Sequence, residues 1–152
     1  TRAIIDAVKP TRTHYTIEPM PWMLPSSPEQ YLDLIRDIDR PGFGVHLDYA
    51  NMINGFDRYH NARDFLRHCF KLLGPHIKSI HAKDVHMEDA LPCSLVEARP
   101  GQGELDLELV LQLSQSLGDD TTVFVEHLDT HEDYLNAISH MQKCAAAADV
   151  PY

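Results

Sequence analysis

Each of four short strand-like segments in this 152-residue chain ends, on its polar face, in a residue that can bind a divalent cation or transfer a proton. These residues are Glu18, Asp48, His81 and Glu126. Three carboxylates and one imidazole form a donor set that suits Mn²⁺ or Mg²⁺, tolerates Zn²⁺ or Co²⁺ and suits Cu⁺ poorly. No cysteine stands at such a position, so we do not expect a zinc site built from thiolates. The four can act together only if the fold brings the segment ends together.

The strand-like segments alternate between apolar and polar side chains. They are residues 14–18, 43–48, 77–84 and 121–126. In the second, Phe43, Val45 and Leu47 share one face, and the other face is polar or small. An open sheet with helices on both faces needs central strands that are apolar on both sides. One polar face therefore favours a barrel with helices outside and a polar site inside.

A stretch of helical periodicity follows each strand-like segment. The first helix is predicted to begin after Ser27, with Pro28 at the first helical position and Gln30 completing a capping box. The second covers residues 62–73 and stops at a Gly-Pro pair. These signals make each strand and its following helix one βα unit.

The C-terminal half follows the same alternation. A long loop through Pro92 and a turn at residues 100–103 leads to a helix over residues 105–117. The last helix starts near Thr130, and residues 1–9 resemble the final turns of a preceding helix.

Four such units predict a single α/β domain over residues 1–152, with a parallel sheet. A complete barrel of eight units takes about 250 residues, so we expect a half-barrel. In a barrel the carboxyl ends of the strands meet at one rim, where active sites lie. This fold would place the four candidate ligands side by side.

Composition excludes several classes of function. Thirteen Lys and Arg against 23 Asp and Glu give a net charge of −10, which opposes nucleic-acid binding. No apolar run approaches the roughly 20 residues of a membrane span. Three cysteines without a C-x-x-C pattern fit a reducing, cytoplasmic compartment. The chain begins at Thr1 with no signal or transit peptide pattern, and we expect it to be part of a longer chain.

Five short segments together resemble those of a known family. They are TIEPMPW (residues 16–22), GVHLDYAN (44–51), HAKD (81–84), PGQGELD (100–106) and VEH (125–127). In this order they resemble the last four βα units of the xylose isomerase-like TIM barrels. That family holds sugar and sugar-phosphate isomerases and epimerases, some dehydratases and a branch that cleaves DNA at apurinic sites.

The resemblance implies roles for the four strand-end residues. Glu18, Asp48, His81 and Glu126 would be the metal ligands of the epimerase branch, and Glu18 and Glu126 would also be its acid and base. Mn²⁺ is the first choice of metal, and Mg²⁺, Co²⁺ or Zn²⁺ are compatible with the donors. Asn51 stands where some epimerases have a substrate-binding His.

The chemistry explains these residue types. Removing a proton beside a carbonyl leaves negative charge on oxygen, which a divalent cation stabilises, and epimerisation needs a base and an acid on opposite faces of the carbon. We therefore expect a divalent-metal-dependent isomerase or epimerase of a small sugar or sugar phosphate. The alternatives are a dehydratase or lyase with the same site, or a half-barrel without activity of its own. Cleavage of DNA is disfavoured by the charge and by too few ligands for a zinc cluster.

Further side chains are candidates for substrate binding. Lys83 would either hold a substrate hydroxyl or phosphate or pair with Asp84, and we favour the pairing. Arg99 would reach the substrate or be an exposed loop residue. His46 lies one step deeper than Asp48 on the polar face and is expected to support it. Trp22, in the loop after Glu18, would pack against a sugar ring or over the barrel mouth.

A half-barrel would leave backbone groups unpaired along both outer strands. We therefore expect the partners to be a small carbohydrate substrate and either a second copy of this chain or the N-terminal half of the same barrel.

Overall fold

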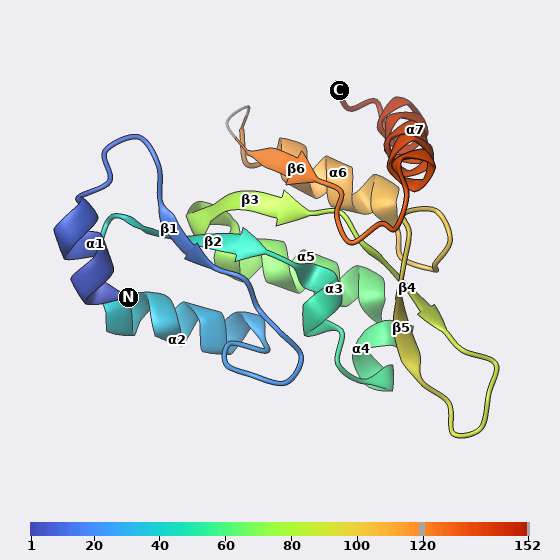
Figure 1. Cartoon of the computed structure of the whole chain (residues 1–152), viewed down its shortest axis with the longest axis horizontal. Coiled ribbons are helices and arrows are strands. Elements are labelled where there is room, and N and C mark those ends of the chain that lie inside the picture. The colour runs from blue at the N-terminus through green and yellow to red at the C-terminus, as the bar shows by residue number, and fades with distance from the viewer. Residues whose placement is uncertain (119–120, 152) are drawn as a thin grey trace.

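The computed structural model of the protein describes residues 1–118 and 121–151, and in these residues four parallel strands form one sheet in the order β1-β2-β3-β6 (Figure 1). The strands are β1 (Tyr15–Ile17), β2 (Phe43–Leu47), β3 (Ile77–His81) and β6 (Thr122–Phe124). Each neighbouring pair is parallel, so the chain must cross back through a helix between strands.

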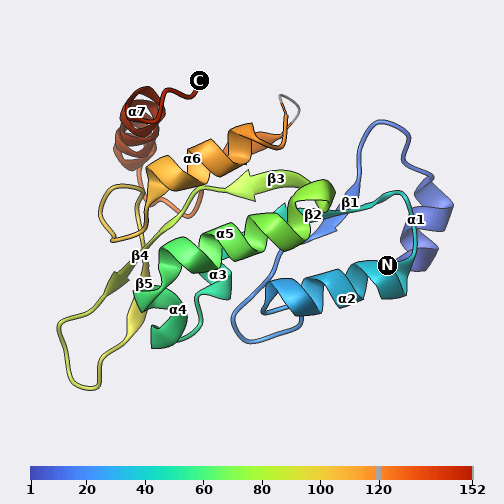
Figure 2. The same ribbon diagram turned by 180° about the vertical axis from the view of Figure 1, so that it is seen from behind.

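The helices are α1 (Arg2–Val8), α2 (Pro28–Ile38), α3 (Tyr49–Met52), α4 (Phe56–His60), α5 (Ala62–Leu73), α6 (Leu107–Gln115) and α7 (His131–Ala147), with a 3₁₀ turn, η1 (Gly74–His76). Helices α2, α5 and α6 lie side by side on one face of the sheet, and α7 packs against α6 (Figure 2). The predicted helices are confirmed to within a few residues, including the one at the start of the chain.

One face of the sheet forms the core, as the alternating pattern predicts. Val45, Leu47 and Ile80 are fully buried and cluster with Leu66 and Leu73 of α5. The opposite face carries polar side chains. Because α2, α5 and α6 cover only the apolar face, the polar face stays free to hold a site.

Side-chain caps fix where the helices begin. Ser27 Oγ accepts a hydrogen bond from Gln30 N at 3.2 Å, as predicted. The reciprocal bond of the predicted capping box is displaced by one residue, because Gln30 Oε1 accepts from Ser26 N at 2.8 Å. Asp106 and Thr130 cap α6 and α7 in the same way. Each cap satisfies an N–H group that the helix itself leaves unpaired.

The strands are shorter at their carboxyl ends than predicted. Asp48 is not in β2 but caps α3, with its Oδ1 accepting from Asn51 N at 2.9 Å. Glu18 and Glu126 also lie just beyond their strands, and His81 is the last residue of β3. Asp48 is thus held at the rim by the first turn of α3, whereas His81 is held there by β3 itself.

The segment predicted as a long loop contains a β-hairpin. Strands β4 (Asp84–Met87) and β5 (Leu95–Ala98) pair antiparallel in a separate two-stranded sheet that projects beyond the ends of the parallel strands (Figure 1). The predicted third strand ran through Asp84, but the parallel strand ends at His81 and β4 begins a new sheet. Short strands with charged side chains gain their stability from pairing with each other, which periodicity does not reveal.

Asp84 anchors the return of this hairpin. Its carboxylate accepts hydrogen bonds from the backbone N–H groups of Val85, Gly101, Gly103 and Leu105, at 2.9 to 3.1 Å. A Cβ atom at Gly103 would collide with this carboxylate, and Gly101 adopts φ +92° against the ring of His140. The turn predicted at residues 100–103 is confirmed, and its glycines are required by close packing.

The sheet is open at both sides. Strands β1 and β6 each pair with one neighbour among the residues that the structure describes. No described helix is long and apolar enough to cross a membrane.

Candidate metal centre

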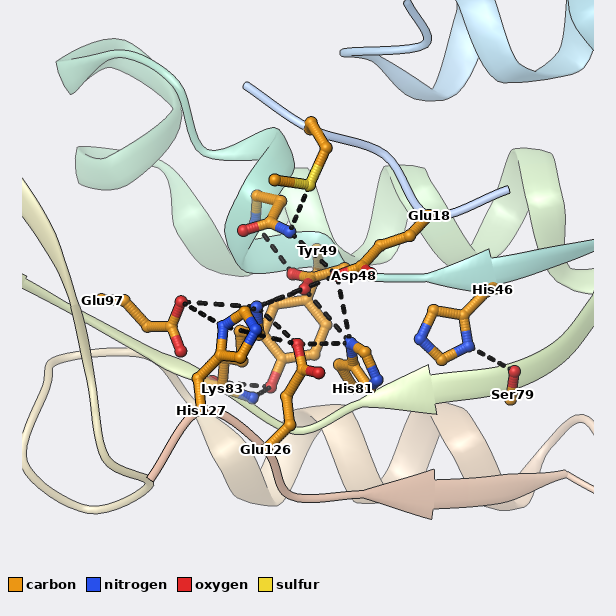
Figure 3. Close-up of polar contacts among 12 residues, drawn as sticks. Glu18, His46, Asp48, Tyr49, Ser79, His81, Lys83, Glu97, Glu126 and His127 are labelled. Carbon is orange, nitrogen blue, oxygen red and sulfur yellow. Dashed lines mark hydrogen bonds and ion pairs between the residues drawn. The ribbon is translucent and has the colours of Figure 1, made fainter. Parts of the chain in front are cut away.

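The fold brings together the four residues predicted at the strand ends. Glu18, Asp48, His81 and Glu126 each place one ligand atom within 4.8 Å of the others (Figure 3). The four come from the carboxyl ends of β1, β2, β3 and β6, which are neighbours in the sheet. Parallel pairing therefore converts distant sequence positions into one cluster, named here the rim cluster.

His81 lies at the centre of the rim cluster. Its Nδ1 is 2.7 Å from Glu126 Oε1, 3.3 Å from Glu18 Oε1 and 3.4 Å from Asp48 Oδ2. Asp48 is fully buried and the other side chains are partly buried. Three acidic groups converging on one imidazole in a shielded setting make a site of high negative charge.

Lys83 does not pair with Asp84, so that prediction is wrong. Its Nζ is 2.8 Å from Asp48 Oδ2 and 2.7 Å from Glu126 Oε1, and the side chain is 1% exposed. The Asp84 carboxylate is already occupied by backbone N–H groups. Tyr49 fixes the backbone of Lys83 by accepting from its N–H and donating to its C=O. The ion pairs outweigh burial and raise the pKa of Lys83, which keeps it cationic.

The electrostatics of the rim cluster shift its pKa values. Burial raises the pKa of Glu18, and the carboxylates of Asp48 and Glu126 raise it further. Burial acts in the same direction on Asp48, but hydrogen bonds from His81 and Lys83 outweigh it and lower that pKa. Burial lowers the pKa of His81, but the surrounding carboxylates raise it above its ordinary value. The ionised form of Glu18 is thus disfavoured in the cluster, whereas His81 and Lys83 favour the ionised form of Asp48.

The donor atoms fit a divalent cation. Glu126 Oε1 is buried without a hydrogen bond in the described part of the chain, although His81 Nδ1 and Lys83 Nζ each lie 2.7 Å away. Carboxylate oxygens and one imidazole nitrogen are the ligands that Mn²⁺ and Mg²⁺ accept. A cation would relieve the repulsion between the carboxylates of Glu18 and Glu126.

Besides Lys83, two of the predicted substrate residues touch the rim cluster. Asn51 Nδ2 donates to Glu18 Oε1 at 3.2 Å. The His46 ring lies edge-on to the His81 ring, with centroids 3.9 Å apart, and its Nδ1 contacts Ser79 Oγ at 2.5 Å. Burial and the nearby His81 lower the pKa of His46 to about 4, so it is neutral at neutral pH. His46 therefore packs against the ring of His81, and Asn51 fixes the carboxylate of Glu18.

Trp22 and Arg99 lie further out. Trp22 is 77% exposed and lines a cavity beside the rim cluster. Arg99 is neither an exposed loop residue nor in contact with the cluster, because it follows β5 and its Nε lies 3.8 Å from Asp133 Oδ1 of α7. Only 19% of the Arg99 side chain is exposed.

Sequence reasoning missed two residues beside the cluster. Glu97 Oε2, on β5, lies 3.4 Å from both Lys83 Nζ and His127 Nδ1. His127 adopts φ 54°, a left-handed conformation that an ordinary residue rarely takes, and its Nδ1 is 3.3 Å from Lys83 Nζ. The position of His127 directly after Glu126 was the available signal, whereas Glu97 depends on the unpredicted hairpin.

A parallel strand–helix sheet with an acidic and histidine cluster at its carboxyl rim defines an α/β-barrel type of fold with a candidate metal site. The family model of the xylose isomerase-like TIM barrel matches residues 1–144, and the chain belongs to this family. No curated protein matches the chain.

Solved structures agree with this assignment. A xylose isomerase domain protein from Planctomyces limnophilus superposes with a TM-score of 0.70 at 18% identity, over 97% of this chain and 50% of that one. A xylose isomerase-like TIM barrel protein from Mycobacterium smegmatis, in complex with magnesium, gives 0.69 at 16% identity, over 97% and 49%. An L-ribulose 3-epimerase gives 0.62 at 13% identity, over 97% and 54%. The chain spans about half the length of these structures, which confirms the half-barrel.

Proposed function

We propose that this chain carries the metal-binding half of a divalent-metal-dependent isomerase or epimerase of a small sugar or sugar phosphate. The observation that supports this most strongly is the rim cluster, in which two glutamates from opposite edges of the sheet flank Asp48 and His81. The L-ribulose 3-epimerase among the similar structures supports sugar chemistry of this kind.

Glu18, Asp48, His81 and Glu126 would hold the metal, with Mn²⁺ or Mg²⁺ as the best match to the donors. When bound, a divalent cation stabilises negative charge on the substrate oxygen beside the carbon that loses its proton. Lys83 keeps the carboxylates of Asp48 and Glu126 in place through its two short ion pairs.

Glu18 and Glu126 are proposed to move the proton. They reach the cluster from β1 and β6, the two outermost strands, so they can approach a bound substrate from different sides. One carboxylate would take the proton from carbon and the other would supply a proton to the opposite face. Asn51 positions Glu18 by donating to its Oε1.

The remaining part of the barrel is proposed to come from an N-terminal half or from a second copy of this chain. The open edges at β1 and β6 and the half-length match to solved barrels support this. Light scattering at micromolar concentration tests it for the 152-residue chain. A monodisperse 17.3 kDa particle with intact circular dichroism would contradict the need for a partner.

The proposed reaction is tested by hydrogen exchange. The complete protein, loaded with Mn²⁺, is incubated with ketoses in deuterium oxide, and mass spectrometry follows deuterium at the carbon beside the carbonyl. Metal-dependent incorporation is expected. Loss of water from the substrate would indicate a lyase instead, and no exchange with any ketose would refute the proposal.

A further inference from the structure

Lys83 lies among carboxylates that come from two parts of the fold. Its Nζ is 2.7 Å from Glu126 Oε1, 2.8 Å from Asp48 Oδ2 and 3.9 Å from Glu18 Oε1, which all follow parallel strands. A fourth carboxylate, that of Glu97, lies 3.4 Å from Nζ and belongs to β5 of the hairpin. Only 1% of the Lys83 side chain is exposed, so this chain alone encloses the ammonium group.

The candidate metal ligands offer the same oxygen atoms to Lys83 and to His81. Glu126 Oε1 is 2.7 Å from His81 Nδ1. Glu18 Oε1 and Asp48 Oδ2 are 3.3 Å and 3.4 Å from that nitrogen. A divalent cation bound at the rim cluster would therefore draw on the negative charge that Lys83 already uses. Two cations that share these oxygens repel each other, and this repulsion is stronger in a shielded site than in water.

Glu97 contacts Lys83 without being a candidate metal ligand. Its charge therefore remains available to the ammonium group when a metal uses the other three carboxylates. In Figure 3, Glu97 lies on one side of Lys83 and His81 on the other. His127 completes the group, because its Nδ1 is 3.3 Å from Lys83 Nζ and 3.4 Å from Glu97 Oε2.

The pairing of the hairpin strands determines where Glu97 lies. Strand β4 begins at Asp84, the residue after Lys83, and Val85 is paired with Glu97 of β5. Antiparallel pairing holds such cross-strand neighbours at a fixed separation. Lys83 therefore stands at the junction between the hairpin and the parallel strand that ends at His81. A change in the partners of Lys83 would affect both.

We propose that Glu97 is a positioning residue for the metal centre and that it acts through Lys83. When a divalent cation occupies the rim cluster, Glu97 becomes the main partner of the Lys83 ammonium group. The ammonium group then competes less with the metal for Asp48 and Glu126, and its ion pair with Glu97 ties the hairpin to the occupied centre. The inference rests on the metal centre of the proposed function and adds to it a residue outside the ligand set.

A double-mutant cycle on Mn²⁺ affinity tests this inference. Isothermal titration calorimetry of the complete protein compares the unsubstituted chain, Glu97→Gln, Lys83→Met and the double variant. Glu97→Gln should weaken Mn²⁺ binding, and the loss should be at least about threefold larger with Lys83 present than in the Lys83→Met background. The direct attraction between Glu97 and the metal is present in both backgrounds, so it cancels in this comparison. Equal losses in both backgrounds would overturn the inference.

Glu88→Gln is the matched control for the hairpin. Glu88 is exposed after β4 and its carboxylate contacts Ser94 Oγ, so this change should leave Mn²⁺ affinity unaltered. A weakening as large as that of Glu97→Gln would mean that the charge of the hairpin, and not the contact with Lys83, sets the affinity. No Mn²⁺ binding by the unsubstituted protein would refute the metal centre and with it the proposed function. Binding without coupling would refute only the role of Glu97.

Amide hydrogen exchange of the hairpin is a second test that needs no Lys83 variant. Mass spectrometry follows residues 84–98 without metal and at saturating Mn²⁺, in the unsubstituted protein and in Glu97→Gln. Mn²⁺ should slow exchange of the hairpin amides about three- to tenfold in the unsubstituted protein, because the ion pair with Lys83 opposes local opening. In Glu97→Gln most of this slowing should be lost. The same slowing in both proteins would contradict the inference, also if Lys83→Met fails to fold.

Discussion

Asp48 and Asp84 are both almost completely buried, and their surroundings differ in kind. Asp84 is 1% exposed and is satisfied by four backbone N–H groups, which carry no net charge. Asp48 is 0% exposed and shares one oxygen with Lys83 and His81, beside two further carboxylates. A carboxylate that accepts all its hydrogen bonds from backbone N–H groups holds a loop in place. A carboxylate among ionisable side chains keeps the capacity to exchange one cation for another.

The largest effect is expected at the two glutamates that are proposed to move the proton. Glu18→Gln and Glu126→Gln should each reduce deuterium exchange beside the substrate carbonyl by about 10²- to 10⁴-fold, because a glutamine cannot carry the proton. Substrate binding should change less. Glu108→Gln, on the exposed side of α6, is the matched control. Full exchange in either cluster variant would assign that glutamate a purely structural role.

Metal affinity should separate the two buried aspartates. Asp48→Asn should weaken Mn²⁺ binding by at least about 100-fold, since loss of a direct ligand costs no less than loss of an outer one. Asp84→Asn should leave the affinity nearly unchanged, because Asp84 contacts backbone rather than the cluster. Isothermal titration calorimetry measures both. Similar losses of Mn²⁺ affinity in the two variants would contradict the assignment of Asp48 as a metal ligand and of Asp84 as a structural residue.

The stability of the fold should depend on Asp84, which is not expected to affect metal affinity. Asp84→Ala would leave backbone N–H groups of the hairpin return without acceptors, and we expect it to lower the free energy of unfolding by about 3 kcal/mol. Asp89→Ala removes an exposed carboxylate from the same hairpin and should change it by less than about 0.5 kcal/mol. Thermal denaturation of both variants checks this. If Asp84→Ala lowers the free energy of unfolding no more than Asp89→Ala does, the hydrogen bonds from backbone N–H groups to Asp84 do not stabilise the fold.

The smallest effect expected is on the pH dependence of metal binding. The carboxylates around His81 raise its pKa, so protons compete for its Nδ1 at a higher pH than for an ordinary histidine. Below that raised pKa the protonated ring cannot bind metal, and affinity for Mn²⁺ should fall by about tenfold per pH unit. Calorimetry at several pH values measures the slope. In His81→Asn this component of the slope should vanish, and its persistence would point to another group.

The rim cluster was predictable because strand periodicity is local. Alternation in residues 43–48 identifies a polar face, and Asp48 lies on it at the carboxyl end. In a parallel sheet all such ends share one rim, so a correct fold class is enough to bring Glu18 and Glu126 together. The helix caps at Ser27 and Thr130 were predictable for the same reason, since each acts within three residues.

The hairpin and the partners of Lys83 and Arg99 could not be predicted in this way. Strands β4 and β5 are stable because they pair with each other, and Arg99 is placed by its packing against α7. Lys83 and Asp84 are adjacent in sequence, which suggested an ion pair, yet neighbours along an extended chain point to opposite sides. Their side chains therefore belong to different environments.

The sequence by itself determined the one-sided pattern of the strands, the starts of the helices at Ser27 and Thr130, and the four candidate ligand types at the strand ends, because each depends on residues close together in the chain. The tertiary structure alone decided that Asp84 accepts hydrogen bonds from backbone N–H groups of residues 101–105 and that the side chain of Lys83 points toward the rim cluster. It also decided that Glu97 and His127 meet beside the cavity. Such contacts join residues far apart in the chain, and they form only when the sheet, the hairpin and α7 have packed together.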